Sequence, residues 1–220
     1  MSYAPAEISQ PLIRSRHWDD PVRTACKRIL DVVLSGILLM LCLPVILVLG
    51  LAVKLTSPGP VFYRWKVVGR NGRPFVGYKI RSMVANADEL KIRLSQHNEM
   101  RGPVFKLTHD PRITPLGAWM RRYSLDELPQ LYSVFKGDMA LVGPRPPLVT
   151  EYEKFTEFQK QKLDVKPGIT CLWQIGGRNQ INDFNEWVRL DLEYIRRWSL
   201  GLDFRILLGT FGTVFSGSGK

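Results

Sequence analysis

Residues 32–53 read VVLSGILLMLCLPVILVLGLAV, and none of these 22 residues carries a charge. About 20 apolar residues in a helix cover the ~30 Å hydrocarbon core of a bilayer. We therefore interpret the run as a membrane helix, with a buried core helix as the alternative. A secretory signal peptide fits poorly, because about thirty residues precede the run and no small-residue cleavage site follows it.

Pro44 lies near the middle of this run and bears on how it meets a membrane. Proline removes a backbone hydrogen bond and clashes with the preceding turn, so a kink is expected, and neither half of the run crosses a bilayer alone. Basic residues flank both ends: Arg23, Lys27 and Arg28 precede the run and Lys54 follows it. Positive charge at both ends does not orient a single span. A re-entrant helix fits this pattern, and a kinked single pass fits it as well.

The charge of the whole chain points to anionic partners. The 220 residues include 31 Lys and Arg against 20 Asp and Glu, a net charge of +11. Such a surplus favours nucleic acid, acidic lipid or phosphorylated metabolites. The cysteines Cys26, Cys42 and Cys171 form no CxxC pair and the three histidines are scattered, so neither a disulfide-stapled domain nor a zinc site is supported.

The remaining patterns predict a mostly helical α+β fold. Short strands are expected at 61–63 and 75–80, with Asn71-Gly72 as a hairpin turn between them. Helical spacing is expected at 83–96, 148–163 and 182–198. An apolar, aromatic helix at 200–215 suits either a membrane interface or packing on the core. We therefore expect a polar tail over residues 1–24, the membrane helix over 25–55, the main domain over 56–216 and a short tail over 217–220.

Two adjacent carboxylates, Asp126 and Glu127, stand out in the sequence RRYSLDELPQ at 121–130. Ser124 with Glu127 three residues on fits a helix capping box, the structural interpretation of the pattern. Pro129 is tolerated only in a first helical turn, which places the helix start close to Asp126. Ionised carboxylates at that position also suit a nucleophile towards phosphorus or a ligand for a divalent cation. The spacing alone favours the cap and leaves catalysis open.

Three arginines lie on turns rich in proline or glycine. Arg145 has a proline on each side, Arg112 follows Asp110-Pro111, and Arg178 follows a Gly-Gly pair. A stiff loop aims a guanidinium group, which suits a pair of phosphate oxygens, although a solvated surface arginine is the plainer interpretation. The sequence has no Walker A motif and no GxGxxG, so the standard nucleotide cradles are not supported.

Together these motifs resemble the bacterial sugar transferase family, whose members are monotopic polyprenyl-phosphate phosphoglycosyl transferases. The resemblance covers nearly the whole chain from residue 27 to about residue 215. Its motifs, in order, are KRILD (27–31), the apolar helix with Pro44, SPGPVFY (57–63), YKIRSM (78–83), DPRIT (110–114), SLDELPQL (124–131), KGDMALVGPRP (136–146), KPGIT (166–170), GRN (177–179) and DLEYI (191–195). The multi-span region of larger members is absent, so we expect a short form limited to the catalytic core.

The resemblance implies a role for each matching residue. Asp126 would attack the β-phosphate of a UDP-sugar and form a covalent phosphosugar-enzyme, releasing UMP, and Glu127 would bind Mg²⁺. The phosphate of undecaprenyl phosphate would then take the sugar phosphate. The residues implied to contact phosphate or nucleotide are Arg121, Arg145 and Arg178. Lys79, Arg81 and Arg112 are added as basic residues expected at the same anionic surface.

The resemblance also implies where the protein works. The family's re-entrant helix, here with Lys27, Arg28, Asp31 and Pro44, would hold the catalytic domain at the cytoplasmic face of the bacterial inner membrane, in contact with lipid. The stretch 98–106, NEMRGPVFK, resembles members that use UDP-glucose or UDP-galactose. The product would start an exopolysaccharide, O-antigen or capsule glycan. Nucleic acid is not expected as a partner, and a homodimer is left open.

Two positions depart from the family pattern, and two other hypotheses compete with the enzyme. Leu43 stands where short members have a serine, and Cys171 where glycine is usual. A membrane-anchored basic adaptor would explain the charge and the apolar helix, but not the paired carboxylates. An inactive scaffold of the same family would not explain why the Asp126-Glu127 pair is intact.

Overall fold

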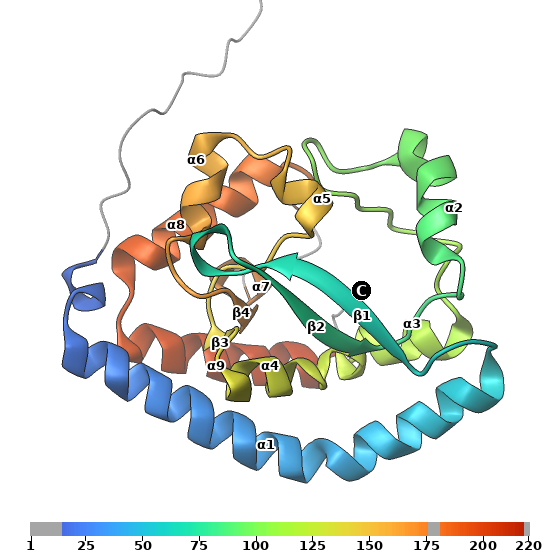
Figure 1. The fold of residues 1–220 in the computed structure, drawn as a ribbon, viewed down its shortest axis with the longest axis horizontal. Helices are drawn as coiled ribbons and strands as arrows, with labels where there is room; N and C mark the ends of the chain where they lie inside the picture. Colours follow the sequence, from blue (N-terminus) through green and yellow to red (C-terminus); the bar gives the residue numbers. More distant parts are fainter. Residues whose placement is uncertain (1–14, 176–180, 218–220) are drawn as a thin grey trace, which may run out of the picture.

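One helix, α1 (Pro21–Thr56), runs beneath the rest of the protein in the computed structural model, which describes residues 15–175 and 181–217 (Figure 1). Asp20 caps the helix, because its Oδ1 accepts hydrogen bonds from the N–H groups of Val22 and Arg23. The helix continues through Pro44 and bends, with its convex side facing away from the domain. Within the described ranges, α1 is the helix that is long and apolar enough to cross a membrane.

Two small sheets and a set of short helices lie above α1. The first sheet pairs β1 (Phe62–Val68) with β2 (Pro74–Ile80) in antiparallel fashion, and the second pairs β3 (Ala140–Val142) with β4 (Gly168–Thr170) in parallel. The helices are α2 (Ala87–Leu94), α3 (Pro115–Arg122), α4 (Gln130–Lys136), α5 (Val149–Tyr152), α6 (Glu157–Lys160), α7 (Leu172–Ile175), α8 (Phe184–Arg197) and α9 (Leu200–Phe215). Five 3-10 turns join them within the described residues: η1 (Arg16–Trp18), η2 (Arg70–Gly72), η3 (Ser95–His97), η4 (Leu125–Glu127) and η5 (Gln161–Leu163). This arrangement confirms the predicted α+β, mostly helical fold.

The hairpin turn forms where the sequence predicts it. Asn71 and Gly72 both have positive φ, 55° and 76°, the left-handed region that asparagine and glycine tolerate best. The strands on either side are longer than expected, seven residues each. The helix expected over 148–163 is wrong, because the chain breaks into α5, α6 and η5. Thr156 begins α6 with a capping box to Gln159, which ends any continuous helix there.

The start of α1 is fastened to the domain by charged side chains. Lys27 donates from Nζ to Asp203 Oδ2 at 2.7 Å and to the carbonyl of Val142 at 3.1 Å. Asp31 accepts from the N–H of Leu141 at 3.0 Å. Arg28 donates to the last carbonyls of α4, those of Val134 and Phe135. The KRILD residues therefore attach the apolar helix to β3, α4 and α9.

The second half of α1 packs on a different part of the domain. Ile46, Leu49 and Val53 form a buried cluster with Ile80 at the end of β2 and Met120 of α3. At the end of the helix, the Arg81 guanidinium donates to the carbonyls of Ser57 and Pro58 and to Ser57 Oγ. Both halves of α1 therefore contact the same domain.

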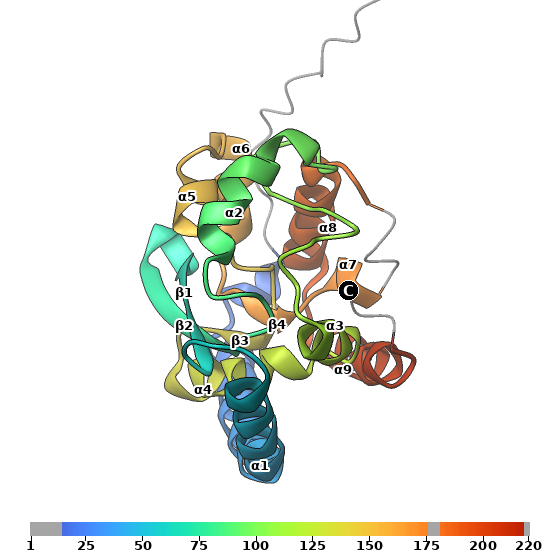
Figure 2. The ribbon, with the colours of Figure 1, turned by 90° about the vertical axis from the view of Figure 1, so that its right-hand side faces the viewer.

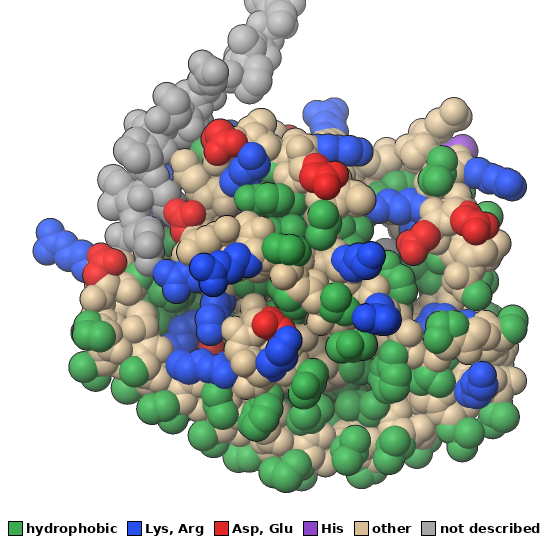
Figure 3. All heavy atoms as spheres, viewed as in Figure 1, with side chains coloured by type: hydrophobic (Ala, Val, Ile, Leu, Met, Phe, Trp, Pro, Cys, Tyr) green, Lys and Arg blue, Asp and Glu red, His purple; other side chains and the backbone are tan. Residues whose placement is uncertain are grey.

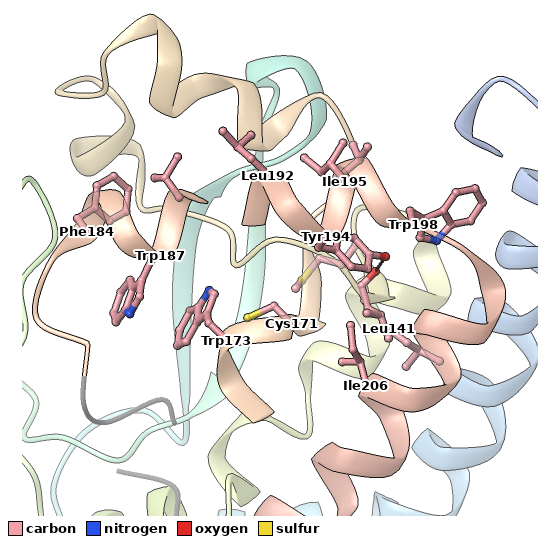
Figure 4. Packing of buried hydrophobic residues seen from close by; sticks show 14 of the residues in the cluster. Leu141, Cys171, Trp173, Phe184, Trp187, Leu192, Tyr194, Ile195, Trp198 and Ile206 are labelled. Atoms are coloured by element: carbon pink, nitrogen blue, oxygen red, sulfur yellow. Dashed lines mark hydrogen bonds between the residues drawn. The ribbon is translucent and has the colours of Figure 1, made fainter. Parts of the chain in front are cut away.

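The main core lies between α8, α9 and the β3–β4 pair, and it is rich in aromatic rings (Figure 4). The indoles of Trp173 and Trp187 stack with centroids 4.4 Å apart and planes within 4°. Trp18, before α1, stacks on Trp198 at 4.0 Å and donates from Nε1 to the carbonyl of Ile195. Residues 15–18, in the stretch expected to be a tail, therefore dock on the end of α8.

Apolar side chains gather along the lower edge of the molecule, over α1 (Figure 3). Figure 2 shows α1 projecting below the domain, with α9 and α3 higher up, at the lower side of the domain. The exposed side chains of α1 include Met40, Leu41, Leu47, Val48 and Leu51, each more than 60% exposed. Helix α9 packs on the core, one of its two expected roles, because it buries Asp203 and Ile206. It also exposes Phe204, Leu208, Phe211 and Phe215, and its expected place at a membrane interface stays a prediction.

We predict that Lys27→Met lowers the free energy of unfolding by about 3–5 kcal/mol, because it leaves the buried Asp203 carboxylate without its ammonium partner. Chemical denaturation of the protein in detergent micelles measures the change. Arg23→Ala is the control, since its ion pair with Asp20 is exposed and is expected to contribute about 1 kcal/mol or less. Equal effects of the two substitutions would contradict the role given to Lys27.

Candidate active site

The two carboxylates lie on η4, between α3 and α4, and not in a helical cap. Ser124 has a positive φ of 54° and its side chain caps nothing, so the predicted capping box is wrong. Helix α4 begins at Gln130 rather than near Asp126. Leu125 and Leu128, on either side of the dyad, pack on the cluster formed by the second half of α1. The Asp126-Glu127 turn thus packs on a buried cluster to which α1, β2 and α3 all contribute.

Glu127 is held by two basic side chains from different parts of the chain. Its Oε1 lies 2.7 Å from Lys79 Nζ on β2 and 3.7 Å from Arg145 Nη1 in the loop after β3. The Lys79 ammonium also lies 4.2 Å from the centroid of the Trp65 ring on β1. Burial lowers the pKa of Lys79; Glu127 opposes this shift and Arg145 adds to it. The fold therefore brings together Asp126, Glu127, Lys79 and Arg145, four of the predicted site residues.

A close approach of two backbones positions the Arg145 loop. The N–H of Gly143 donates to the carbonyl of Thr170, and the N–H of Gly168 donates to that of Pro144. A Cβ added at Gly168 would lie 2.1 Å from the nitrogen of Gly143, so only glycine fits there. This contact explains the paired motifs VGP and KPG. It leaves the Arg145 side chain 31% exposed beside Glu127.

Arg81 and Arg112 bond mainly to the fold itself. Arg81 holds the carbonyls that end α1, as described above. Arg112 forms a two-pronged ion pair with Asp110 and donates to the carbonyl of Ala87. Both residues are 5% exposed. The structure therefore shows them as supports for the hairpin exit and for the start of α2.

The other residues that the sequence singled out lie as follows. Arg121 lies in the last turn of α3 and is partly buried. Burial acts to raise the pKa of Asp110, but the hydrogen bonds from Arg112 outweigh it and the charge of Arg121 adds to the lowering. Arg178 lies outside the described residues. Asp191 of the DLEYI motif is buried against Lys162, with 2.5 Å between its Oδ2 and Nζ, and Tyr194 donates to Asp203 and to the carbonyl of Val142.

Sequence reasoning missed two neighbours of the dyad. Ser82 Oγ lies 3.5 Å from Asp126 Oδ2, and Trp65 forms the surface beneath Lys79. The strand register carried a signal for Trp65, because it pairs with Gly77, whose missing side chain leaves room for the indole. Ser82 lies two residues after the end of β2, where strand alternation no longer holds, so the direction of its side chain could not be predicted.

The carboxylate pair fits Mg²⁺ only in a coordination shell that substrate phosphates and water complete. No group of three or more His, Cys, Asp or Glu side chains within the described ranges could hold a metal ion. Mg²⁺ is commonly bound through one or two carboxylates, with substrate phosphates and water completing the shell. Asp126 and Glu127 supply two oxygen donors of this kind. Their chemistry therefore suits a site that the substrate completes.

Comparison with known proteins identifies the class. A model of the bacterial sugar transferase family matches residues 22–217, and the chain belongs to that family. It is 50% identical over 193 residues to the galactosyl transferase CpsE of Streptococcus agalactiae serotype III, which covers 88% of this chain and 43% of that relative.

Two further relatives differ in length. The UDP-glucose:undecaprenyl-phosphate glucose-1-phosphate transferase of Escherichia coli K12 is 39% identical over 203 residues, covering 89% of this chain and 41% of the relative. The exopolysaccharide production protein ExoY of Rhizobium meliloti is 37% identical over 199 residues, covering 88% and 87%. The chain thus spans less than half of the two larger relatives and most of ExoY.

A carboxyl group near Arg145 offers a test of the site's electrostatics. Burial raises the pKa of Glu151, and this outweighs the hydrogen bond from the Leu148 N–H and the nearby charges of Lys91 and Arg145. The folded state therefore favours the protonated form. Stability from this group is present at low pH and is lost as pH rises through the raised pKa.

We therefore predict that Glu151→Gln, which keeps the acceptor for the Leu148 N–H, is more stable than the parent protein at pH 8. The melting temperature should rise by about 2–4 °C, and the difference should vanish near pH 4. Melting curves across this pH range measure it. Glu153→Gln removes the same charge from an exposed position and serves as the control. A gain that is independent of pH would contradict the assignment.

Proposed function

We propose that this protein transfers a sugar 1-phosphate from a UDP-hexose to undecaprenyl phosphate, the first step of a membrane-bound glycan assembly. The observation that carries the proposal is the Asp126-Glu127 turn, whose neighbours Leu125 and Leu128 pack on the cluster shared with the apolar helix and whose Glu127 lies beside Lys79 and Arg145. The names of the relatives add galactose, glucose and undecaprenyl phosphate. We propose glucose or galactose as the sugar, and exopolysaccharide, O-antigen or capsule as the product class.

The proposed reaction has two displacements on phosphorus. The Asp126 carboxylate attacks the β-phosphorus of the donor; a bond forms between Oδ and phosphorus, and the bond to the bridging oxygen breaks, so UMP leaves with that electron pair. An oxygen of undecaprenyl phosphate then attacks the same phosphorus and releases Asp126 as a carboxylate. Two steps spare the site from holding donor and acceptor phosphates together.

The basic residues offset the repulsion between anions in this mechanism. Arg145 is partly exposed on a stiff loop, so its planar group suits two oxygens of the donor diphosphate. Lys79 orients Glu127 from below. Glu127 would hold Mg²⁺ together with the diphosphate, and the ion would supply charge stabilisation for the transferred phosphoryl group while Asp126 serves as the nucleophile.

The shape of α1 supports a re-entrant arrangement at the cytoplasmic face of the inner membrane. Lys27 and Asp31 attach the first half to the domain, and Leu49 and Val53 attach the second half. A helix fastened to one domain along both halves leaves only its convex side for lipid, where the exposed apolar residues lie. The dyad then lies at the depth of the headgroups, where the phosphate of a lipid carrier is found.

We predict that Asp126→Asn lowers UMP release from UDP-glucose or UDP-galactose by at least about 1,000-fold, because the amide cannot act as the nucleophile. The assay uses purified protein with Mg²⁺ and undecaprenyl phosphate. Mass spectrometry of the parent protein without acceptor should show the added mass of one hexose phosphate. Full activity of the Asn variant would rule out the covalent mechanism, and nucleic-acid binding without UMP release would favour the adaptor hypothesis.

The topology has its own test. We predict that cysteines placed at Arg16 and Arg64, both exposed and on opposite ends of α1, resist a thiol reagent confined to the periplasm. Both should react after the inner membrane is permeabilised. A protein with a known periplasmic cysteine controls for the reagent. Labelling of one position and not the other would establish a single pass instead.

A further inference from the structure

Lys79 and Arg145 both face the same carboxylate oxygen, Oε1 of Glu127, so this oxygen already has basic partners. Lys79 Nζ lies 2.7 Å from Oε1, and Arg145 Nη1 lies 3.7 Å from the same atom. The Lys79 and Glu127 side chains are only 14% and 11% exposed, so water screens this contact weakly. A divalent cation that approaches Glu127 therefore meets an ammonium group at the carboxylate oxygen.

Two carboxylates and two basic side chains meet in this part of the site. Asp126 and Glu127 supply the carboxylates, and Lys79 and Arg145 supply the cations. A divalent cation that binds alone adds positive charge beside Lys79 and Arg145. A diphosphate that binds alone adds negative charge beside the two carboxylates. When the two ligands bind together, each offsets the charge of the other, and this matters because like charges in a weakly screened site repel strongly.

We propose that Lys79 is an internal counter-ion which keeps Glu127 from binding a divalent cation until a nucleoside diphosphate is present. The inference rests on the proposed function, because it takes the donor to be a nucleoside diphosphate sugar. In this arrangement the metal and the donor bind cooperatively, and Lys79 sets the size of the coupling. Neither is held tightly alone, which keeps the carboxylate pair from being occupied before the donor arrives.

The geometry assigns this role to Lys79 rather than to Arg145. Lys79 is 1.0 Å nearer to Oε1 by the two distances, and less exposed. It also has a second place for its charge, since the Trp65 ring centroid lies 4.2 Å from Nζ. A flexible lysine stem allows the ammonium to leave the carboxylate while it stays over the indole. Arg145, on its stiff loop, remains available to the diphosphate.

The test measures metal binding without turnover. Mn²⁺ replaces Mg²⁺, and free Mn²⁺ is followed by electron paramagnetic resonance in the presence and absence of UDP; the Mn²⁺ that UDP binds without protein is measured separately and subtracted. The full-length protein in detergent micelles is compared with three variants. Lys79→Met removes the charge and keeps the bulk, Lys79→Arg keeps the charge, and Lys136→Met removes an exposed lysine whose ion pair lies with Asp138, away from the dyad.

We expect UDP to tighten Mn²⁺ binding to the parent protein on the order of tenfold or more. Lys79→Met should bind Mn²⁺ alone on the order of tenfold more tightly than the parent, since one repelling charge is gone, and should gain less from UDP. Lys79→Arg and Lys136→Met should resemble the parent. Melting curves confirm that each variant is folded.

Several results would overturn the inference. Equal Mn²⁺ affinity of the parent with and without UDP would do so whatever the variants show, as would an absence of Mn²⁺ binding in both states. Weaker Mn²⁺ binding by Lys79→Met would show that the lysine supports the metal site rather than guarding it. UMP release is measured separately. If the protein releases UMP but UDP does not change its affinity for Mn²⁺, the proposed function stands and the counter-ion inference fails. If UDP changes the affinity for Mn²⁺ but no UMP is released, the counter-ion inference stands and the proposed function fails.

Discussion

Lys27 and Asp31 are the buried charged side chains of α1, and their burial determines where that helix can lie. Each needs a partner within the domain, because a buried and unpaired charge is strongly destabilising. The partners are Asp203 and the carbonyl of Val142 for Lys27, and the N–H of Leu141 for Asp31. They fix the first half of α1 beneath the core and leave its apolar convex side exposed. The position of the apolar surface follows from these contacts.

The same contacts connect the helix to the chemistry. Leu141 and Val142 belong to β3, and the chain leaves β3 through Gly143 and Pro144 to reach Arg145. The other half of α1 contributes Ile46, Leu49 and Val53 to the cluster on which the turn with Asp126 and Glu127 packs. Both parts of the candidate site are therefore linked to the same bent helix. In the proposed function, this link would keep the turn at a constant depth relative to the membrane, which would suit an acceptor whose phosphate stays in the headgroup layer.

Several features could be predicted from local sequence because their causes are local. The apolar run, the Asn71-Gly72 turn and the hairpin depend on neighbouring residues, and each forms as expected. The capping box at Ser124 failed, because the Glu127 side chain forms a stronger contact with Lys79, which lies 48 residues away. The parallel β3–β4 pair was missed, since each strand has three residues and owes its position to glycines that approach from separate motifs. Arg81 and Arg112 looked like phosphate ligands because sequence cannot show that a guanidinium already has partners.

The sequence by itself determined that a charge-free apolar run with a central proline precedes a basic domain with paired carboxylates, and the order of its motifs identified the family. Tertiary structure alone decided which basic residues stand beside the dyad and that both halves of the helix contact one domain. The physical reason is distance along the chain. Lys79, Glu127 and Arg145 meet, and Lys27 reaches Asp203, only in a fold that buries the apolar side chains and pairs the buried charges at the same time.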